Sequence, residues 1–280
     1  MDIFLFLSGI GCYFSLTKSN NYFPWLKKRF IRIFIPYTIV LLTLRMLGLF
    51  VDNVSWSEWL LYYSTLRFWT HHDGMWYVAL LVLLYPLAPF IYRILNDSRR
   101  TLTAIILIVL CLAITHISII NISDLASSVI ENLKGAFKHI VSFIIGMYLA
   151  PYVKQNIRIN ALCVIAVSAL GCILFHFLMK DIYYSWLYVF PTLIVLSSFL
   201  EHIPDNSKIN GFFLWLGVAS LESYLANVGI KALMPLFLYK WIDHQIFTGH
   251  YLDYSLVIIS GFILTYTSNN LSKRIAAIIS

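Results

Sequence analysis

Residues 76–85 read Trp-Tyr-Val-Ala-Leu-Leu-Val-Leu-Leu-Tyr, an unbroken run in which no side chain carries a charge. Residues 104–112 form a second run of this kind. A membrane strand would alternate apolar and polar side chains, whereas both runs are apolar throughout, so they indicate helices. A helix needs about 20 mostly apolar residues to cross the hydrocarbon core of a bilayer. Apolar segments of roughly that length recur along the whole chain.

The composition indicates the same environment. Apolar residues make up 60% of the 280 and charged residues 12%, whereas a soluble domain has about 45–50% and about 25%. The excess apolar surface therefore faces lipid. We predict an all-α fold, a polytopic transmembrane helix bundle in which residues 1–280 form a single integral membrane domain. The spans that we predict, about nine in number, cover residues 2–17, 33–51, 75–95, 101–120, 136–153, 160–178, 185–201, 212–232 and 254–271.

The charged and aromatic residues give the orientation. The net charge is +7, and most Lys and Arg residues fall on one side of the predicted spans. Lys and Arg collect in cytoplasmic loops, so we predict a cytoplasmic C-terminus and an external N-terminus in the cell membrane. Trp25 and Trp56 lie near predicted span ends, where interfacial aromatic residues gather.

Two kinds of site are not expected. Nucleic-acid binding would require a basic face on a folded module, and no stretch between the predicted spans is long enough to form one. The four cysteines lie inside apolar runs, at spacings unlike those of a metal site. We therefore predict no nucleic-acid partner and no metal, and membrane lipids as the surrounding partner.

The first predicted span contains the segment Phe4–Gly9, which ends in Ser8 and Gly9. Small residues further along this span, Gly11 and Ser15, stand four positions apart. Such residues let helices approach closely, so packing alone accounts for the pattern.

A basic segment precedes the second predicted span. Lys28, Arg29 and Arg32 alternate there with apolar residues and lie within about one helical turn. The fork of an Arg side chain suits phosphate oxygens. The segment is either a topology anchor that touches anionic lipid headgroups or a cradle for a phosphate-bearing cofactor.

A polar segment opens the third predicted span, with His71 and His72 ahead of Trp76 and Tyr77. Two imidazoles and an aromatic pair at the outer end of a membrane span can supply a general base and rings that stack on a sugar. A solvated loop at the membrane interface, without a functional role, would have the same composition. We predict that most of the other histidines are interfacial or lie at helix ends: His116, His139, His176, His202, His244 and His250.

Glu222 is an acid inside the predicted span 212–232, two residues before Tyr224. A carboxylate is costly in lipid, so it usually faces the bundle interior or a water-filled cavity and marks a functional site. We therefore predict a functional role for Glu222.

In this order, the four segments resemble the membrane acyltransferase-3 family, whose members are integral membrane O-acyltransferases, chiefly of bacterial surface polysaccharides. Phe4–Gly9 resembles the Phe-x-x-x-Ser-Gly stretch of the family, and Lys28–Tyr37 resembles its basic loop ending in Pro-Tyr. Trp76 and Tyr77 resemble its aromatic pair, and Leu216–Leu225 its Leu-Gly-x-x-Ser-x-x-x-Tyr-Leu segment. The resemblance extends over nearly the whole chain.

The resemblance implies transfer of an acyl group, in particular acetyl from acetyl-CoA, to a hydroxyl of a cell-surface polysaccharide or glycolipid of the cell envelope. The donor would be cytoplasmic and the carbohydrate acceptor on the other side. The residues implied for the donor phosphates are Lys28, Arg29 and Arg32. Those implied for the acceptor are Trp76, Tyr77 and Tyr224. The candidate catalytic residues are His72 and His71 as acceptor-side bases, Ser8 as oxyanion donor, and Glu222.

The sequence also departs from the family pattern. The family has about ten core helices, and the first, which carries a histidine central to acyl transfer, has no counterpart here. We therefore expect the chain to be truncated at its N-terminus. Gly74 and Asn227 stand where many members have histidine. Two alternatives stay open: a non-catalytic exporter of polysaccharide or lipid-linked sugar, and an inactive truncated member of the family.

Overall fold

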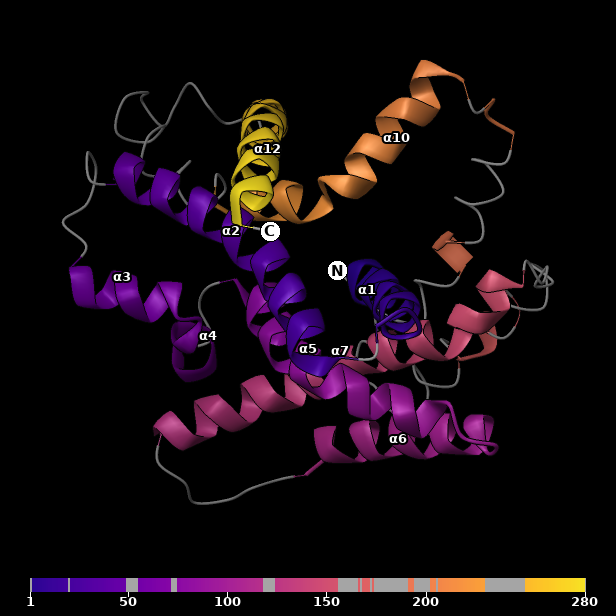
Figure 1. Ribbon diagram of the computed structural model, residues 1–280. Helices are drawn as coiled ribbons and strands as arrows, with labels where there is room; N and C mark the ends of the chain where they lie inside the picture. The colour runs from indigo at the N-terminus through magenta and orange to yellow at the C-terminus, as the bar shows by residue number, and fades with distance from the viewer. Residues whose placement is uncertain are drawn as a thin grey trace. The chain divides into compact units, whose positions relative to one another are not determined.

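The computed structural model describes residues 2–19, 21–48, 55–71, 75–117, 124–155, 166, 168–171, 173, 191–193, 202–204, 206–229 and 250–279. Every regular element in these residues is an α-helix, which confirms the predicted all-α fold (Figure 1). The helices are α1 (Asp2–Leu16), α2 (Tyr22–Gly48), α3 (Trp56–Tyr63), α4 (Leu66–His71), α5 (Trp76–Leu95), α6 (Arg100–Thr115), α7 (Asp124–Lys154), α10 (Lys208–Val218) and α12 (His250–Ile279). Residues 220–229 form a further helical stretch after α10.

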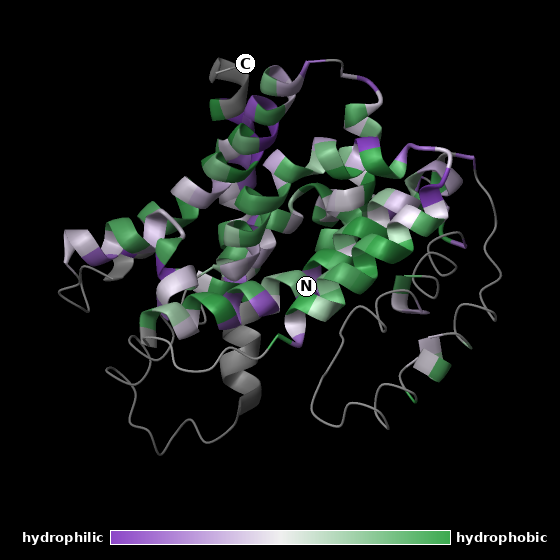
Figure 2. Ribbon diagram, turned by 90° about the horizontal axis from the view of Figure 1, so that it is seen from below, coloured by the Kyte–Doolittle hydropathy of each residue, from purple (hydrophilic) through white to green (hydrophobic). Residues whose placement is uncertain are grey.

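Within the described part of the chain, two helices are long and apolar enough to cross a membrane. They are α5 and residues 125–153 of α7, while α1 and α6 are apolar but shorter. Hydrophobic residues, in green, are frequent along the helical ribbons (Figure 2). The predicted spans 160–178 and 185–201 lie largely outside the described residues. The number of nine spans therefore stays a prediction.

The basic segment is helical, in agreement with the placement of its three cations within about one helical turn, but the helix begins earlier than the predicted span. Helix α2 begins at Tyr22, eleven residues before the predicted start of the span, so Lys28, Arg29 and Arg32 are helical. Pro24 does not prevent this, because the first N–H groups of a helix have no helical partner and proline is tolerated there. Helix α7 likewise begins at Asp124, well before the predicted residue 136.

The described residues divide into two compact units. Unit 1 contains residues 1–25 and 80–210, and unit 2 contains residues 26–79 and 211–280. Helices α2 and α5 contribute residues to each unit. The two units are described separately below.

In unit 1, α1 packs closely against α7 at two glycines. A Cβ atom on Gly9 would overlap the backbone carbonyl of Phe143, and one on Gly146 would overlap the backbone of Phe6. Glycine at a crossing lets two membrane helices approach at backbone distance. The small residue of α1 that makes this approach is thus Gly9, while Ser15 bonds the Cys12 carbonyl at 2.9 Å.

Helix α6 also packs on α7 in unit 1, and Arg100 ties them together. Pro151 lacks an N–H, so the Met147 carbonyl four residues earlier loses its helical partner. The Arg100 side chain donates through Nη2 to this carbonyl at 3.1 Å and to that of Tyr148 at 2.6 Å. Its guanidinium also lies over the Tyr13 ring of α1, 5.5 Å from the centroid. Arg100 therefore supplies the hydrogen bond that Pro151 removes.

Trp25 was expected at the membrane interface, but it is buried inside the protein. It is only 4% exposed, and its indole N–H donates to Ser15 Oγ at 2.8 Å. Its ring packs edge-on against Tyr85 of α5. Trp25 therefore belongs to the interior of unit 1, because both its ring and its N–H find protein partners there. Trp56, by contrast, is 64% exposed.

In unit 2, aromatic side chains join α2 to α3. The Tyr37 hydroxyl donates to the Tyr62 carbonyl at 3.0 Å, and its ring stacks on that of Tyr63. The Tyr63 hydroxyl in turn lies 2.8 Å from Thr38 Oγ1. Tyr37 is fully buried. These bonds satisfy the phenol groups that the stacked rings carry into the interior.

The glycine crossing gives the first prediction. Gly146→Ala should lower the free energy of unfolding by about 1–3 kcal/mol, because the added methyl group forces α1 away from α7. Gly135→Ala is the matched control on the same helix, since no atom lies within 4 Å of its added Cβ. It should be neutral or slightly stabilising, because alanine favours helix over glycine by up to about 1 kcal/mol. Thermal unfolding of the purified protein in detergent measures both, and equal effects would contradict the crossing.

Candidate functional site

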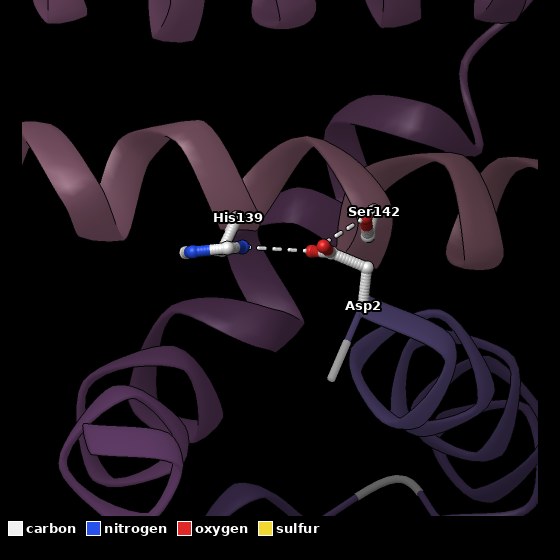
Figure 3. Close-up of polar contacts among 3 residues, drawn as sticks. All are labelled: Asp2, His139 and Ser142. Atoms are coloured by element: carbon white, nitrogen blue, oxygen red, sulfur yellow. Dashed lines mark hydrogen bonds and ion pairs between the residues drawn. The ribbon is translucent and has the colours of Figure 1, made fainter. Parts of the chain in front are cut away.

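A polar cluster in unit 1 joins the start of α1 to the middle of α7. Oδ1 of Asp2 lies 2.9 Å from Nδ1 of His139 and accepts a hydrogen bond of 3.1 Å from the Ser142 hydroxyl (Figure 3). Asp2 and Ser142 are 2% and 1% exposed, and 26% of the His139 side chain is exposed. His139 and Ser142 stand three residues apart, so one face of α7 presents both to Asp2.

This arrangement orients an imidazole. When Nδ1–H of His139 donates to the Asp2 carboxylate, Nε2 is the nitrogen that takes up a proton. The second ring nitrogen points away from Asp2 (Figure 3). Asp2 also stands in the first turn of α1, where the positive end of the helix dipole favours a carboxylate. The cluster can therefore hold a proton or pass it on.

The amino-acid sequence did not indicate this cluster. Interfacial or helix-end positions were predicted for most histidines, whereas His139 lies in the middle of α7 and packs on a carboxylate from 137 positions earlier in the chain. His116 agrees with the prediction, because it is exposed at the end of α6. A usable signal was present in Asp2, a carboxylate placed at the beginning of an apolar helix.

A second polar cluster lies in unit 2 around Glu222. Its side chain is 6% exposed, and its Oε1 accepts a hydrogen bond of 3.3 Å from Asn269 Nδ2 on α12. Arg32 on α2 and Lys273 on α12 both lie close enough to Glu222 to interact with it electrostatically. Unit 2 thus brings together a buried acid and two cations from three segments of the chain.

Two predicted acceptor residues also meet in unit 2. The rings of Tyr77 and Tyr224 pack edge to face, with centroids 5.2 Å apart. Both are at most 5% exposed, whereas Trp76 is half-buried. An aromatic pair of this kind contributes packing energy beyond its buried area.

A comparison with protein families identifies the family to which this chain belongs. A family model described as an acyltransferase domain matches residues 1–269. The chain belongs to the membrane acyltransferase-3 family. This confirms the resemblance stated above, and membrane location and the use of an acyl donor follow from the family. The comparisons with curated proteins and with solved structures found no match.

The three basic residues predicted to bind the donor phosphates lie on α2. Lys28 and Arg32 are exposed and Arg29 is half-buried. The three residues lie within about one turn of this helix. Of the three, Arg32 interacts electrostatically with Glu222. This interaction connects the basic segment with Glu222 of Leu216–Leu225, two regions that the sequence presented as separate motifs.

The other candidate residues occupy separate places. Ser8 lies half-buried on α1 in unit 1. His71 is the exposed last residue of α4 in unit 2, where its Nδ1 lies 2.7 Å from Thr70 Oγ1. His72 lies outside the described residues. Among the described residues, no group of three or more His, Cys, Asp or Glu side chains suits a metal ion.

The Asp2–His139 contact gives the second prediction. Asp2→Ala and His139→Ala should each destabilise the protein, by up to about 3–5 kcal/mol where a buried charge loses its partner. The double variant should cost less than the sum, with a coupling energy of about 0.5–3 kcal/mol. Thermal unfolding of the wild type, the two single variants and the double variant in detergent measures this coupling energy.

The matched control is a surface pair on the same helix. Glu131 and Lys134 approach to 2.7 Å, with side chains 67% and 20% exposed. Their cycle should give a coupling of at most about 0.5 kcal/mol. An Asp2–His139 coupling no larger than that of the surface pair would show that the cluster does not tie α1 to α7.

Proposed function

We propose that this chain is an integral membrane O-acetyltransferase that moves an acetyl group from acetyl-CoA to a hydroxyl of a cell-surface polysaccharide or glycolipid. The observation that carries the proposal is the match of residues 1–269 to the acyltransferase family. The grouping of Arg32, Glu222 and Lys273 in unit 2 supports it, because a phosphate-bearing donor needs cations beside its binding site.

The proposal includes a topology. The whole chain forms one domain with about nine spans, its C-terminus in the cytoplasm and its N-terminus outside. The positive charge of α2 supports this orientation, since cytoplasmic ends of spans collect Lys and Arg. The donor then binds from the cytoplasm, and the carbohydrate acceptor comes from the other side.

Different residues bind the donor, take the proton and stabilise the negative oxygen in the proposed reaction. Lys28, Arg29 and Arg32 neutralise the phosphates of the donor. A base takes the proton of the acceptor hydroxyl, whose oxygen attacks the thioester carbonyl, and Ser8 donates to the oxygen that becomes negative. The new C–O bond forms, the C–S bond breaks, and the protonated base returns its proton to the leaving thiolate.

The acceptor side uses the aromatic residues. Trp76, Tyr77 and Tyr224 contact the sugar, and the packing of Tyr77 on Tyr224 gives that surface a defined shape. Glu222 is held inside unit 2 by Asn269. A buried carboxylate near two cations can orient them or move a proton, which are the roles proposed for it here.

The test is transfer of labelled acetyl from acetyl-CoA to surface polysaccharide in membranes that contain the chain. The variant Arg29→Ala/Arg32→Ala should raise KM for acetyl-CoA at least about tenfold with little change in kcat, because each charge-assisted bond contributes about 1.5–3 kcal/mol. Lys18→Ala is the control, since Lys18 is an exposed cation outside this segment. Sugar export without acetyl transfer would reject the proposal in favour of a transporter.

A histidine series identifies the base. The sequence points to His71 and His72. Replacement of the base by Gln should lower kcat about 10²–10⁴-fold and leave KM for acetyl-CoA unchanged. The other variant should stay near the wild-type rate, as should His116→Gln on the exposed end of α6. Full activity in all of them would exclude an imidazole base from this set.

A further inference from the structure

Helix α12 carries a polar stripe on a buried face. Thr265, Ser268, Asn269 and Ser272 are between 0% and 8% exposed, and their spacing of three and four residues places them on one side of the helix. Neighbouring positions of α12, such as Ile263 and Tyr266, are exposed and suit lipid contact. The stripe therefore faces the interior of unit 2.

Part of this stripe has no hydrogen-bond partner. Thr265 donates to the Gly261 carbonyl of its own helix at 2.6 Å, and Asn269 donates through Nδ2 to Glu222. Within the described part of the chain, Ser268 Oγ, Asn269 Oδ1 and Ser272 Oγ are buried without a partner. Each such atom costs about 1–3 kcal/mol.

Close packing alone does not explain the stripe. Small residues at these spacings allow helices to approach, but a packed hydroxyl can still bond a carbonyl one turn earlier, as Thr265 does and as Thr267 does on the exposed side. Three unpartnered polar atoms within five residues, beside a buried carboxylate, indicate a polar ligand that bonds them when it is present.

The neighbours of the stripe restrict the ligand. Lys273 follows Ser272 directly, and both Lys273 and Arg32 act electrostatically on Glu222, which bonds Asn269. The stripe thus begins at Ser272, directly before the exposed cation Lys273, and extends about 6 Å along the helix to Ser268. A ligand that is charged at one end and carries uncharged polar groups further along fits this order.

We propose that Ser268, Asn269 and Ser272 bind the amide groups of the pantetheine arm of a CoA thioester. This inference rests on the proposed function, because it extends the same donor site from the phosphates to the arm that carries the acyl group. Pantetheine has two amides, each with one donor and one acceptor. Serine hydroxyls can bond either group, and Asn269 Oδ1 accepts from an N–H.

The test compares two ligands on the purified full-length chain. CoA carries pantetheine, whereas adenosine 3′-phosphate 5′-diphosphate keeps the phosphates of CoA and lacks the arm. Ser268→Ala/Ser272→Ala should weaken CoA binding about tenfold, a loss of one or two neutral hydrogen bonds, and leave the binding of the nucleotide unchanged. Arg32→Ala should weaken both ligands. Thr267→Ala on the same helix should change neither.

Folding is checked in the same samples. Removing an unpartnered buried hydroxyl should leave the thermal stability of the ligand-free protein unchanged or raise it, whereas a structural role for the serines would lower it. Equal loss of both ligands, or no loss of CoA, in the serine variant overturns the proposal. If the wild-type chain binds the two ligands equally, the proposed pantetheine contact is wrong, whereas the proposed phosphate site is supported. A wild-type chain that binds neither overturns the proposed donor as well.

Discussion

A polar group inside a bilayer has no water to bond, so each one has to find its partner within the protein. This constraint accounts for the polar contacts of both units. Arg100 bonds the carbonyl that Pro151 leaves without a helical partner. Asp2 is enclosed by a histidine and a serine, and Glu222 by an asparagine. Where the constraint is not met on α12, the unpartnered atoms are those that we propose to bond the donor.

The polar contact of unit 1 depends on an apolar one. Gly9 and Gly146 let the backbones of α1 and α7 meet, and only at such a separation does the short Asp2 side chain reach His139 and Ser142. The glycines act through packing and the carboxylate through hydrogen bonds. The two effects support each other because they hold the same pair of helices.

Unit 2 combines features that the proposed reaction needs. Cations on α2 and α12 lie near a buried acid, and polar side chains continue from them along α12. The aromatic contact between Tyr77 and Tyr224 joins residues far apart in the chain. A phosphate-bearing donor with a polar arm and a hydroxyl acceptor call for cations, hydrogen-bonding groups and aromatic faces, and all three are present in this unit.

The sequence by itself determined the helical class, the membrane environment and the family, because these follow from long apolar runs and short motifs. It also located α5 to within one residue, at Trp76–Leu95. Only the tertiary structure paired Asp2 with His139 and Glu222 with Asn269, since partners 137 and 47 positions apart leave no local pattern. It also decided that the helix of the second span begins as early as Tyr22 and that Trp25 is buried. Packing between helices sets these features, and hydropathy along a single chain does not record which helices meet.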